Sequence, residues 1–187
     1  MNVRLVKVRP VSRPADTASI LRLDDSFTTT RVYRVATGNL SFDLVETAVD
    51  PPLHKDFAPL PPGPRPGRAV EYAAVDGVDA LIGYASAVYE EWNRRVILWD
   101  LCVASRSRRQ GAGRALIDSV VRFAGTVGAR QVLAETQNVN YPAVQFYLRC
   151  GFRLAGLDMD YYDPKGPGRG EVALFMALDV PDTLLPK

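Results

Sequence analysis

The stretch from Asp100 to Arg114 holds the residues whose types and spacing best suit a chemical function. Its two glycines, Gly111 and Gly113, let a ligand approach backbone N–H groups without a side chain in the way. A helix predicted to follow them would point its positive dipole end at the same place. Arginines add charged hydrogen-bond donors. This combination indicates an anion site suited to a pyrophosphate. The nearby arginines are Arg106, Arg108, Arg109 and Arg114.

Two other phosphate-binding motifs do not fit this loop. A Walker A motif needs Lys and then Ser or Thr after its last glycine, whereas Arg114 and Ala115 follow Gly113. A dinucleotide-binding fingerprint needs a third glycine at the position where this chain has Leu116. The alternative that stays open is a solvated arginine loop that closes a glycine turn and binds nothing.

The elements around the loop predict an α/β fold. Three apolar runs, 69–75, 80–89 and 96–104, are typical of long strands joined by turns. Apolar side chains at helical spacing predict a helix over 113–127, and Asn140 followed by Pro142 predicts the start of another. Because residues 51–68 hold seven of the 14 prolines, we expect a surface loop there. We also expect a short helix at 14–24 and strands at 3–8, 30–36, 40–47, 131–135, 152–159 and 171–178.

Composition narrows the class of protein. The 187 residues suit one domain over 1–187. Two cysteines, Cys102 and Cys150, make neither a disulfide framework nor a zinc site, and we expect both to be buried. The single histidine, His54, argues against a serine-triad hydrolase and against imidazole-rich metal sites, so no metal is expected.

Charge and hydropathy bear on partners and location. Beyond the four loop arginines, 19 basic side chains face 21 acidic ones, which argues against an extended nucleic-acid surface. No uncharged stretch approaches the roughly 20 residues that span a bilayer, and the first residues do not resemble a signal peptide. We therefore expect a cytoplasmic protein with no membrane or nucleic-acid partner. The sequence leaves the oligomeric state open and is compatible with a homodimer.

The pattern R-x-x-G-x-G at 108–113 resembles the acyl-CoA loop of the GNAT superfamily of N-acetyltransferases. Residues 140–152, N-x-P-A-x-x-F-Y-x-x-x-G-F, resemble the second cofactor motif of that superfamily. The resemblance covers about residues 69–178. It implies acetyl-CoA as cofactor and a GNAT-like mixed, mostly antiparallel sheet with a splayed central strand pair and flanking helices.

A narrower likeness points to one branch of the superfamily. Residues 23–29, 42–57, 135–152 and 156–158 are similar to streptothricin (nourseothricin) acetyltransferases, which acetylate an amine on the β-lysine arm of that antibiotic. The expected function is therefore acetylation of a primary amine of streptothricin, giving resistance. Open alternatives are another amine, such as a polyamine or a protein N-terminus, an acyl-CoA-binding protein without turnover, and a small nucleic-acid module that uses the arginines.

The resemblance also implies where the cofactor lies. The pantetheine arm would enter a gap between the strand ending at Val103 and the strand at 131–135. Asn140 would bond this arm, and capping of the following helix is its other expected role. The expected cofactor-binding residues are Leu101, Cys102, Val103, Arg108, Arg109, Gln110, Gly111, Ala112, Gly113, Arg114, Asn140, Ala143 and Tyr147.

Acetyl transfer to an amine needs a base and an acid. A lysine-like amine with a pKa near 10.4 costs about 4.6 kcal/mol to deprotonate at pH 7, which a base must help to offset. Glu135 is the favoured base and Asp100 the second, with an ion pair to the arginines as the alternative for either. The family often has a carboxylate one position before Asp100, where this chain has Trp99.

The remaining expected roles are a proton donor and an acceptor-binding surface. Tyr147 is expected to give a proton to the leaving thiolate, a core aromatic side chain being the alternative. A polycationic acceptor needs an acidic cleft. Asp158, Asp160 and Trp92 are the candidates for binding this small cationic amine.

Overall fold

The computed structural model describes residues 6–57 and 65–185. The described chain divides into two compact units, each considered separately below. The first is built from residues 6–25, 57, 65–133 and 179–185, and the second from residues 26–56 and 134–178. A single domain over 1–187 stays a prediction.

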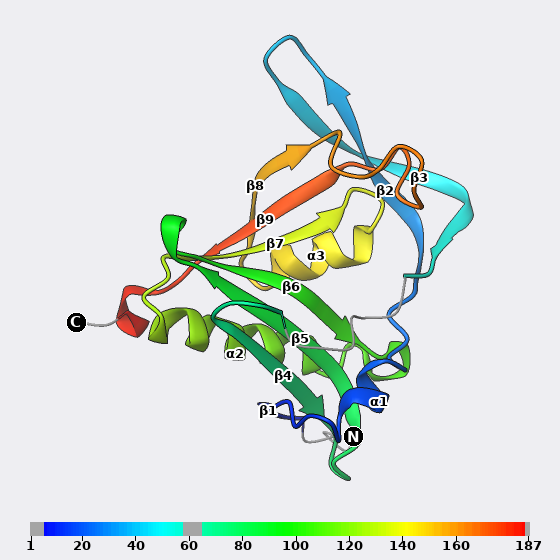
Figure 1. Ribbon diagram of the computed structural model, residues 1–187. Helices are drawn as coiled ribbons and strands as arrows, with labels where there is room; N and C mark the ends of the chain where they lie inside the picture. Colours follow the sequence, from blue (N-terminus) through cyan, green and yellow to red (C-terminus); the bar gives the residue numbers. More distant parts are fainter. Residues whose placement is uncertain (1–5, 58–64, 186–187) are drawn as a thin grey trace. The chain divides into compact units, whose positions relative to one another are not determined.

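The first unit is a sheet packed against a long helix (Figure 1). Strands β1 (Lys7–Pro10), β4 (Ala69–Val75), β5 (Leu81–Glu90) and β6 (Arg95–Val103) are neighbours in that order, and each pair is antiparallel. The first residues of β7 (Gln131–Gln137) continue the sheet beside β6. The helices and 3-10 turns of this unit are α1 (Thr17–Ile20), η1 (Glu91–Asn93), η2 (Ser105–Ser107), α2 (Ala112–Thr126) and η3 (Asp182–Leu184).

Helix α2 supplies the core of this unit. Its stripe of apolar residues is buried as the sequence predicts, with Leu116 and Val120 fully covered. Strand β5 passes close beneath the helix at Gly83, where a Cβ would lie 3.2 Å from Leu116 Cδ1 and 3.0 Å from the carbonyl oxygen of Cys102. The sheet and the helix that carries the glycine loop are therefore packed tightly together at this position.

The second unit combines the later part of β7 with two further strands, a β-hairpin and a helix (Figure 1). Strand β9 (Ala173–Asp179) lies between β7 and β8 (Arg153–Asp158), and β8 and β9 are antiparallel. A hairpin of β2 (Phe27–Thr37) and β3 (Phe42–Lys55) and helix α3 (Tyr141–Arg149) complete it. Its core packs Val144, Val172 and Leu174 against Tyr33, Val35, Leu44 and Leu157.

Asn138 joins three segments of this second unit. Its side-chain Nδ2 donates to the carbonyl oxygen of Tyr33 at 2.7 Å, and its Oδ1 accepts from the N–H of Val172 at 2.8 Å. The side chain is 7% exposed. A buried amide that is satisfied on both sides fixes β2 of the hairpin against the segment that follows β7, the strand of Glu135, and against the residue before β9.

The proline-rich segment corrects one expectation. Strand β3 continues through Pro51 and Pro52 to Lys55, so a loop is wrong for residues 51–55. The strand tolerates these prolines because the register shifts: Ala48 pairs with Arg31 and Leu53 with Thr29, which leaves residues 49–52 opposite Thr30 alone. A bulge does not need the N–H that proline lacks. Residues 58–64 lie outside the described residues.

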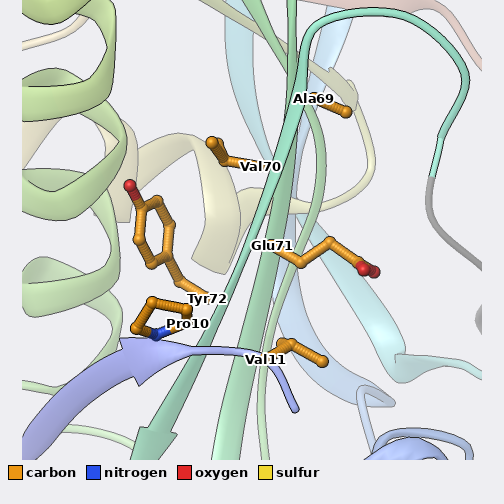
Figure 2. A pocket seen from close by; sticks show the side chains of 6 residues that line it. All are labelled: Pro10, Val11, Ala69, Val70, Glu71 and Tyr72. Carbon is orange, nitrogen blue, oxygen red and sulfur yellow. The ribbon is translucent and has the colours of Figure 1, made fainter. Parts of the chain in front are cut away.

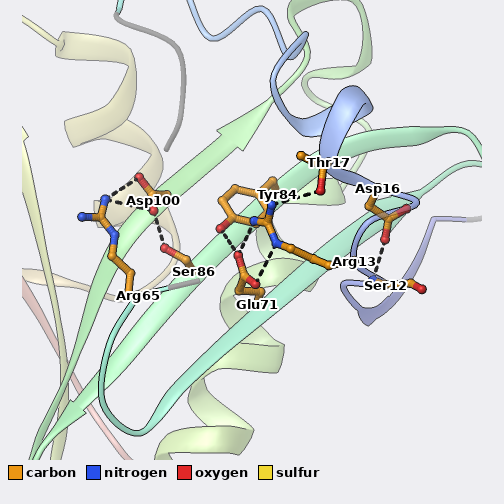
Figure 3. Close-up of polar contacts among 9 residues, drawn as sticks. All are labelled: Ser12, Arg13, Asp16, Thr17, Arg65, Glu71, Tyr84, Ser86 and Asp100. Atoms are coloured by element: carbon orange, nitrogen blue, oxygen red, sulfur yellow. Dashed lines mark hydrogen bonds and ion pairs between the residues drawn. The ribbon is translucent and has the colours of Figure 1, made fainter. Parts of the chain in front are cut away.

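The helix expected at 14–24 is also shorter, because α1 spans only Thr17–Ile20. The residues before it form a turn in which the Asp16 carboxylate accepts from the N–H of Ser12 at 2.7 Å (Figure 3). The same carboxylate pairs with Arg9. This local bonding competes with the first helical turn. Strand β1 begins at Lys7 and does not include Val6. The rest of the strand expected at 3–8 falls on residues 3–5, which lie outside the described part of the chain.

A cluster of charged and hydroxyl-bearing side chains stabilises the first unit (Figure 3). Arg13 Nη2 lies 2.7 Å from Glu71 Oε1, and the hydroxyl of Tyr84 donates to the same oxygen at 2.5 Å. Burial raises the pKa of Glu71, but the bonds from Arg13 and Tyr84 outweigh it, so the pKa lies below its ordinary value. The ionised carboxylate is therefore part of the folded structure.

Glu71→Gln is expected to lower the free energy of unfolding by about 2 kcal/mol, because it removes the carboxylate from a largely buried ion pair. A melting temperature about 4–8 °C lower at pH 7 would report this loss. The stabilisation exists above the ordinary pKa of about 4.5 and disappears as the pH falls through the lowered folded value. The difference between the variants should therefore fade in acid, and equal melting temperatures at pH 7 would contradict it.

Candidate active site

The glycine loop lies where the sequence predicts it, between β6 and α2. Gly111 is exposed at the N-terminus of α2 with φ +89°, and a Cβ there would meet nothing within 4 Å. Because its N-cap residue is a glycine, this helix end has no side-chain cap of its own. Its first N–H groups therefore lack the side-chain partner that a capped helix has, and open space lies beside them. These features fit the diphosphate of an acyl-CoA.

Two of the loop arginines have structural partners. Arg108 Nε donates to the carbonyl oxygen of Val103 at 3.0 Å, which ties the loop to the end of β6. Arg114 pairs with Asp118 one helical turn later at 3.1 Å. Arg109 is exposed and holds a left-handed backbone with φ +61°. Contact of these arginines, and of Gln110, with the cofactor stays a prediction.

Strand β6 carries a bulge directly before the predicted pantetheine-binding residues. Asp100 pairs with Ser86 and Leu98 with Ala87, which leaves Trp99 as an extra residue in β6. Bulges of this kind re-aim side chains beside functional sites. Beyond it, Leu101, Cys102 and Val103 pair regularly with β5. Burial raises the pKa of the Cys102 thiol to about 12, so what Cys102 offers a ligand is its backbone.

Asp100 is engaged within the first unit (Figure 3). The hydroxyl of Ser86 donates to its carboxylate, and Arg65 Nη2 lies 3.2 Å from Oδ1. The Arg65 guanidinium also stacks over the Trp99 ring at 4.7 Å. Asp100 therefore forms an ion pair with an arginine, Arg65, which is the kind of role that the sequence leaves open as its alternative. Because its carboxylate is engaged in this way, Glu135 is the better candidate for the base.

Glu135 lies on β7 in the second unit, where the hydroxyl of Tyr162 donates to its Oε1. Burial raises the pKa of Glu135, and the bond from Tyr162 opposes this. The net pKa lies above its ordinary value. A carboxyl whose pKa moves toward neutrality is better matched to proton abstraction from an amine near pH 7.

Tyr147 is a buried residue of α3 whose ring packs on Phe146 and Phe152. Burial, with a smaller effect from the Glu135 charge, raises its pKa, so the phenol keeps its proton. Within residues 6–57 and 65–185, its hydroxyl makes no hydrogen bond. Tyr147 therefore has the core role that is the alternative prediction, and a proton-donating role stays a prediction.

Asn140 caps α3, as the sequence predicts. Its Oδ1 accepts from the N–H of Ala143 at 3.2 Å, so the N–H of Ala143 is engaged by the cap. Contact of either residue with pantetheine stays a prediction.

The predicted acceptor-binding residues divide between the units. Asp158, the last residue of β8, and Asp160 are exposed in the unit that holds Glu135, and Asp158 Oδ1 accepts from the N–H of Asp160 at 2.9 Å. Trp92 belongs to the first unit and is 85% exposed in η1. The gap predicted beside Val103 draws on both units and stays a prediction.

Two depressions in the surface are other possible locations for a ligand site. One of about 290 Å³ lies along β1 and β4, where Val70 and Tyr72 point to the opposite side from Glu71 (Figure 2). None of the predicted site residues lines it, and Arg13 and Tyr84 already occupy the Glu71 carboxylate. The other, of about 350 Å³, is lined by Leu53, His54, Lys55, Asp56, Pro167 and Glu171.

This second depression includes residues that the sequence did not single out. Lys55 Nζ lies 2.5 Å from Glu171 Oε1, and both charges act on Glu135. Tyr162, the direct partner of Glu135, was also missed. The two adjacent tyrosines before the glycine- and proline-rich turn were the available signal, but their spacing alone does not indicate a contact with β7.

Across residues 6–57 and 65–185, no three His, Cys, Asp or Glu side chains are grouped so that they could hold a metal ion. In the same residues, no helix is long and apolar enough to cross a bilayer.

Comparison with known proteins decides the family. Residues 40–152 match the profile of the acetyltransferase (GNAT) family. The chain is 36% identical over 183 residues to a streptothricin acetyltransferase of Streptomyces lavendulae, covering 91% of this chain and 93% of that one. The chain belongs to the GNAT acetyltransferase family. A streptothricin acetyltransferase of Escherichia coli is 25% identical over 87% of this chain and 90% of its own.

Solved structures agree with this membership. The crystal structure of a nourseothricin acetyltransferase is similar with a TM-score of 0.86 and 39% identity, over 94% of this chain and 99% of that one. A putative streptothricin acetyltransferase from Bacillus anthracis, solved with acetyl coenzyme A, has a TM-score of 0.79 at 23% identity over 94% and 99% of the two chains, a likeness of fold alone. The predicted family, mixed and mostly antiparallel α/β fold, enzyme class and acetyl-CoA cofactor are confirmed.

Proposed function

We propose that this GNAT enzyme transfers the acetyl group of acetyl-CoA to a primary amine of streptothricin and so confers resistance to it. The observation that carries the proposal is the 36% identity to a streptothricin acetyltransferase over nearly the whole chain. That likeness extends beyond the cofactor loop, which all branches of the superfamily share. It includes the β2–β3 hairpin and the segments around Asn138 and Asp158.

The chemistry assigned to the residues is a direct transfer. Glu135 takes a proton from the ammonium group, either directly or through a water molecule. The amine then forms a bond to the thioester carbon while the carbon–sulfur bond breaks, and Tyr147 gives its proton to the sulfur. The new amide nitrogen loses its second proton, which restores the phenol of Tyr147 through solvent, and the proton held by Glu135 is released to water. The raised pKa of Glu135 and the protonated phenol of Tyr147 support this division of roles.

The acceptor is small and, in this proposal, cationic. The exposed carboxylates of Asp158 and Asp160 lie in the same unit as Glu135 and would attract its other ammonium groups. Trp92 is an exposed aromatic surface in the first unit and is kept as a weaker candidate for contact with the antibiotic.

A thiol-release assay with acetyl-CoA tests the function. Streptothricin is compared with spermidine, free lysine and an aminoglycoside at equal concentrations. We expect kcat/KM for streptothricin to exceed that for the other amines at least tenfold. A preference for spermidine would move the enzyme to polyamines, and the absence of thiol release with every amine would overturn the proposed reaction.

Tyr147→Phe is expected to lower kcat about a hundredfold while the dissociation constant of acetyl-CoA changes less than threefold, because the ring packing is retained and only the proton donor is lost. Steady-state kinetics combined with calorimetric titration of CoA would separate the two effects. Full activity would remove the acid role and leave Tyr147 as a core aromatic residue.

A further inference from the structure

The side chain of Tyr162 is held in place by packing against neighbouring residues. Its ring meets the edge of the Tyr161 ring at 5.2 Å between centroids, and Tyr161 in turn packs on Phe175 of β9 at 5.6 Å. On the other side, Gly168 approaches so closely that a Cβ there would lie 3.0 Å from both Cβ and Cγ of Tyr162. The ring is therefore held by aromatic packing and by the turn that follows it.

The turn itself is ordered by short-range hydrogen bonds. The N–H of Lys165 donates to Asp163 Oδ1 at 2.8 Å, and that of Gly166 donates to the Asp163 carbonyl oxygen at 2.9 Å. The N–H of Glu171 donates to the carbonyl oxygen of Gly168 at 3.0 Å. These bonds place the backbone of Gly168 against Tyr162, and the Tyr162 hydroxyl then donates to Glu135 Oε1.

The other charges around Glu135 offset one another. Lys55 of β3 favours the ionised carboxylate, whereas Glu171 disfavours it, and these two residues form an ion pair. Besides Tyr162, the Glu135 charge acts on two phenols among the described residues, Tyr147 of α3 and Tyr161 of the same loop as Tyr162. Burial raises the pKa of both phenols, so they bring no charge.

We infer that Tyr162 is a positioning residue for catalysis, whose hydroxyl orients the Glu135 carboxylate and keeps it ready to accept a proton, and that Gly168 is required to hold it there. The inference rests on the proposed role of Glu135 as the base. Burial also raises the pKa of the Tyr162 phenol, so its hydroxyl remains a donor wherever the enzyme is active. A carboxylate that accepts such a bond is stabilised in its charged form.

The test uses Tyr162→Phe, which keeps the ring, with Tyr161→Phe as the matched control that removes the neighbouring hydroxyl. The first readout is the pH dependence of kcat/KM for streptothricin. We expect the acidic limb of Tyr162→Phe to move to higher pH and the activity at its acidic end to fall about tenfold, with acetyl-CoA affinity within twofold of wild type. The Tyr161→Phe profile should match wild type.

The second readout is independent of any acceptor. The Glu135 carboxyl is titrated by NMR in the full chain with ¹³C-labelled glutamate, and its signal is assigned by its loss in Glu135→Gln. It should titrate at higher pH in Tyr162→Phe than in wild type. The same titration midpoint in both proteins overturns the inference. If the midpoint shifts but streptothricin is not acetylated, the inference about Tyr162 is upheld and the proposed substrate is wrong.

Gly168→Ala gives a second, independent variant. The added methyl group must displace the Tyr162 ring, so the Glu135 titration should shift in the same direction while every titratable group is retained. If Tyr162→Phe does not fold, an unshifted Glu135 titration in folded Gly168→Ala is enough to overturn the inference.

Discussion

Gly111→Asp is expected to raise the dissociation constant of acetyl-CoA about 10³-fold. The new carboxylate would stand at the start of α2, where the diphosphate is expected to bind. Two unit charges of like sign 4 Å apart repel by about 4 kcal/mol at an effective dielectric constant of about 20. Because φ is +89° at this position, a side chain also strains the backbone by roughly 1–2 kcal/mol. Calorimetric titration with CoA measures the loss directly.

The chain offers a matched control for this variant. Gly67 is exposed in the same unit with φ +92°, and a Cβ there would make only an ordinary 3.6 Å contact. Gly67→Asp therefore introduces the same charge and similar strain away from the loop, and it should bind CoA as wild type does. Gly111→Ala separates strain from charge and should lose far less affinity than Gly111→Asp. Wild-type affinity in Gly111→Asp would refute the assignment of the loop.

Local patterns in the sequence predicted the elements that carry the cofactor loop. Strand β4 spans the expected 69–75, and α2 differs from the expected helix by one residue at each end. Both predictions rest on the pattern of apolar side chains within a single element, and this pattern can be read directly from the sequence. The Asn140 cap was predictable for the same reason, since the capping oxygen and its N–H partner lie three residues apart.

Long-range pairs could not be predicted in this way. Arg65 and Asp100 are 35 residues apart, and Glu135 and Tyr162 are 27 apart. No spacing rule relates such residues until the strands pair. The same holds for β3, whose prolines argue for a loop unless the bulge opposite Thr30 is known. The sequence therefore predicted Glu135 as the favoured base and Asp100 as the second, but it could not predict the partners that distinguish them.

The partners of the two acids differ. The carboxylate of Asp100 is engaged by the Arg65 guanidinium and the Ser86 hydroxyl. Glu135 has a neutral donor as its direct partner, and burial raises its pKa. A base must be able to take up a proton during the reaction, and the environment of Glu135 fits the proposal that it does so.

Glu135→Gln is expected to lower kcat/KM about 10³-fold and to remove the rising limb of the pH–rate profile. The folded protein should not suffer, because the amide oxygen can still accept from Tyr162. The folded pKa of Glu135 is raised, so the carboxyl favours folding below its ordinary pKa of about 4.5, and this advantage is lost as the pH rises through the folded value. The variant should therefore melt at the same or a higher temperature than wild type at pH 7.

Asp100→Asn is the matched control, since it makes the same change of carboxylate to amide. It breaks the ion pair with Arg65, so it should lower the melting temperature while kcat/KM falls less than tenfold. The opposite pattern, with Glu135→Gln active on an unchanged pH profile and Asp100→Asn inactive, would transfer the base role to Asp100. If both variants keep the wild-type pH–rate profile, a water molecule accepts the proton, and the raised pKa of Glu135 does not serve this step.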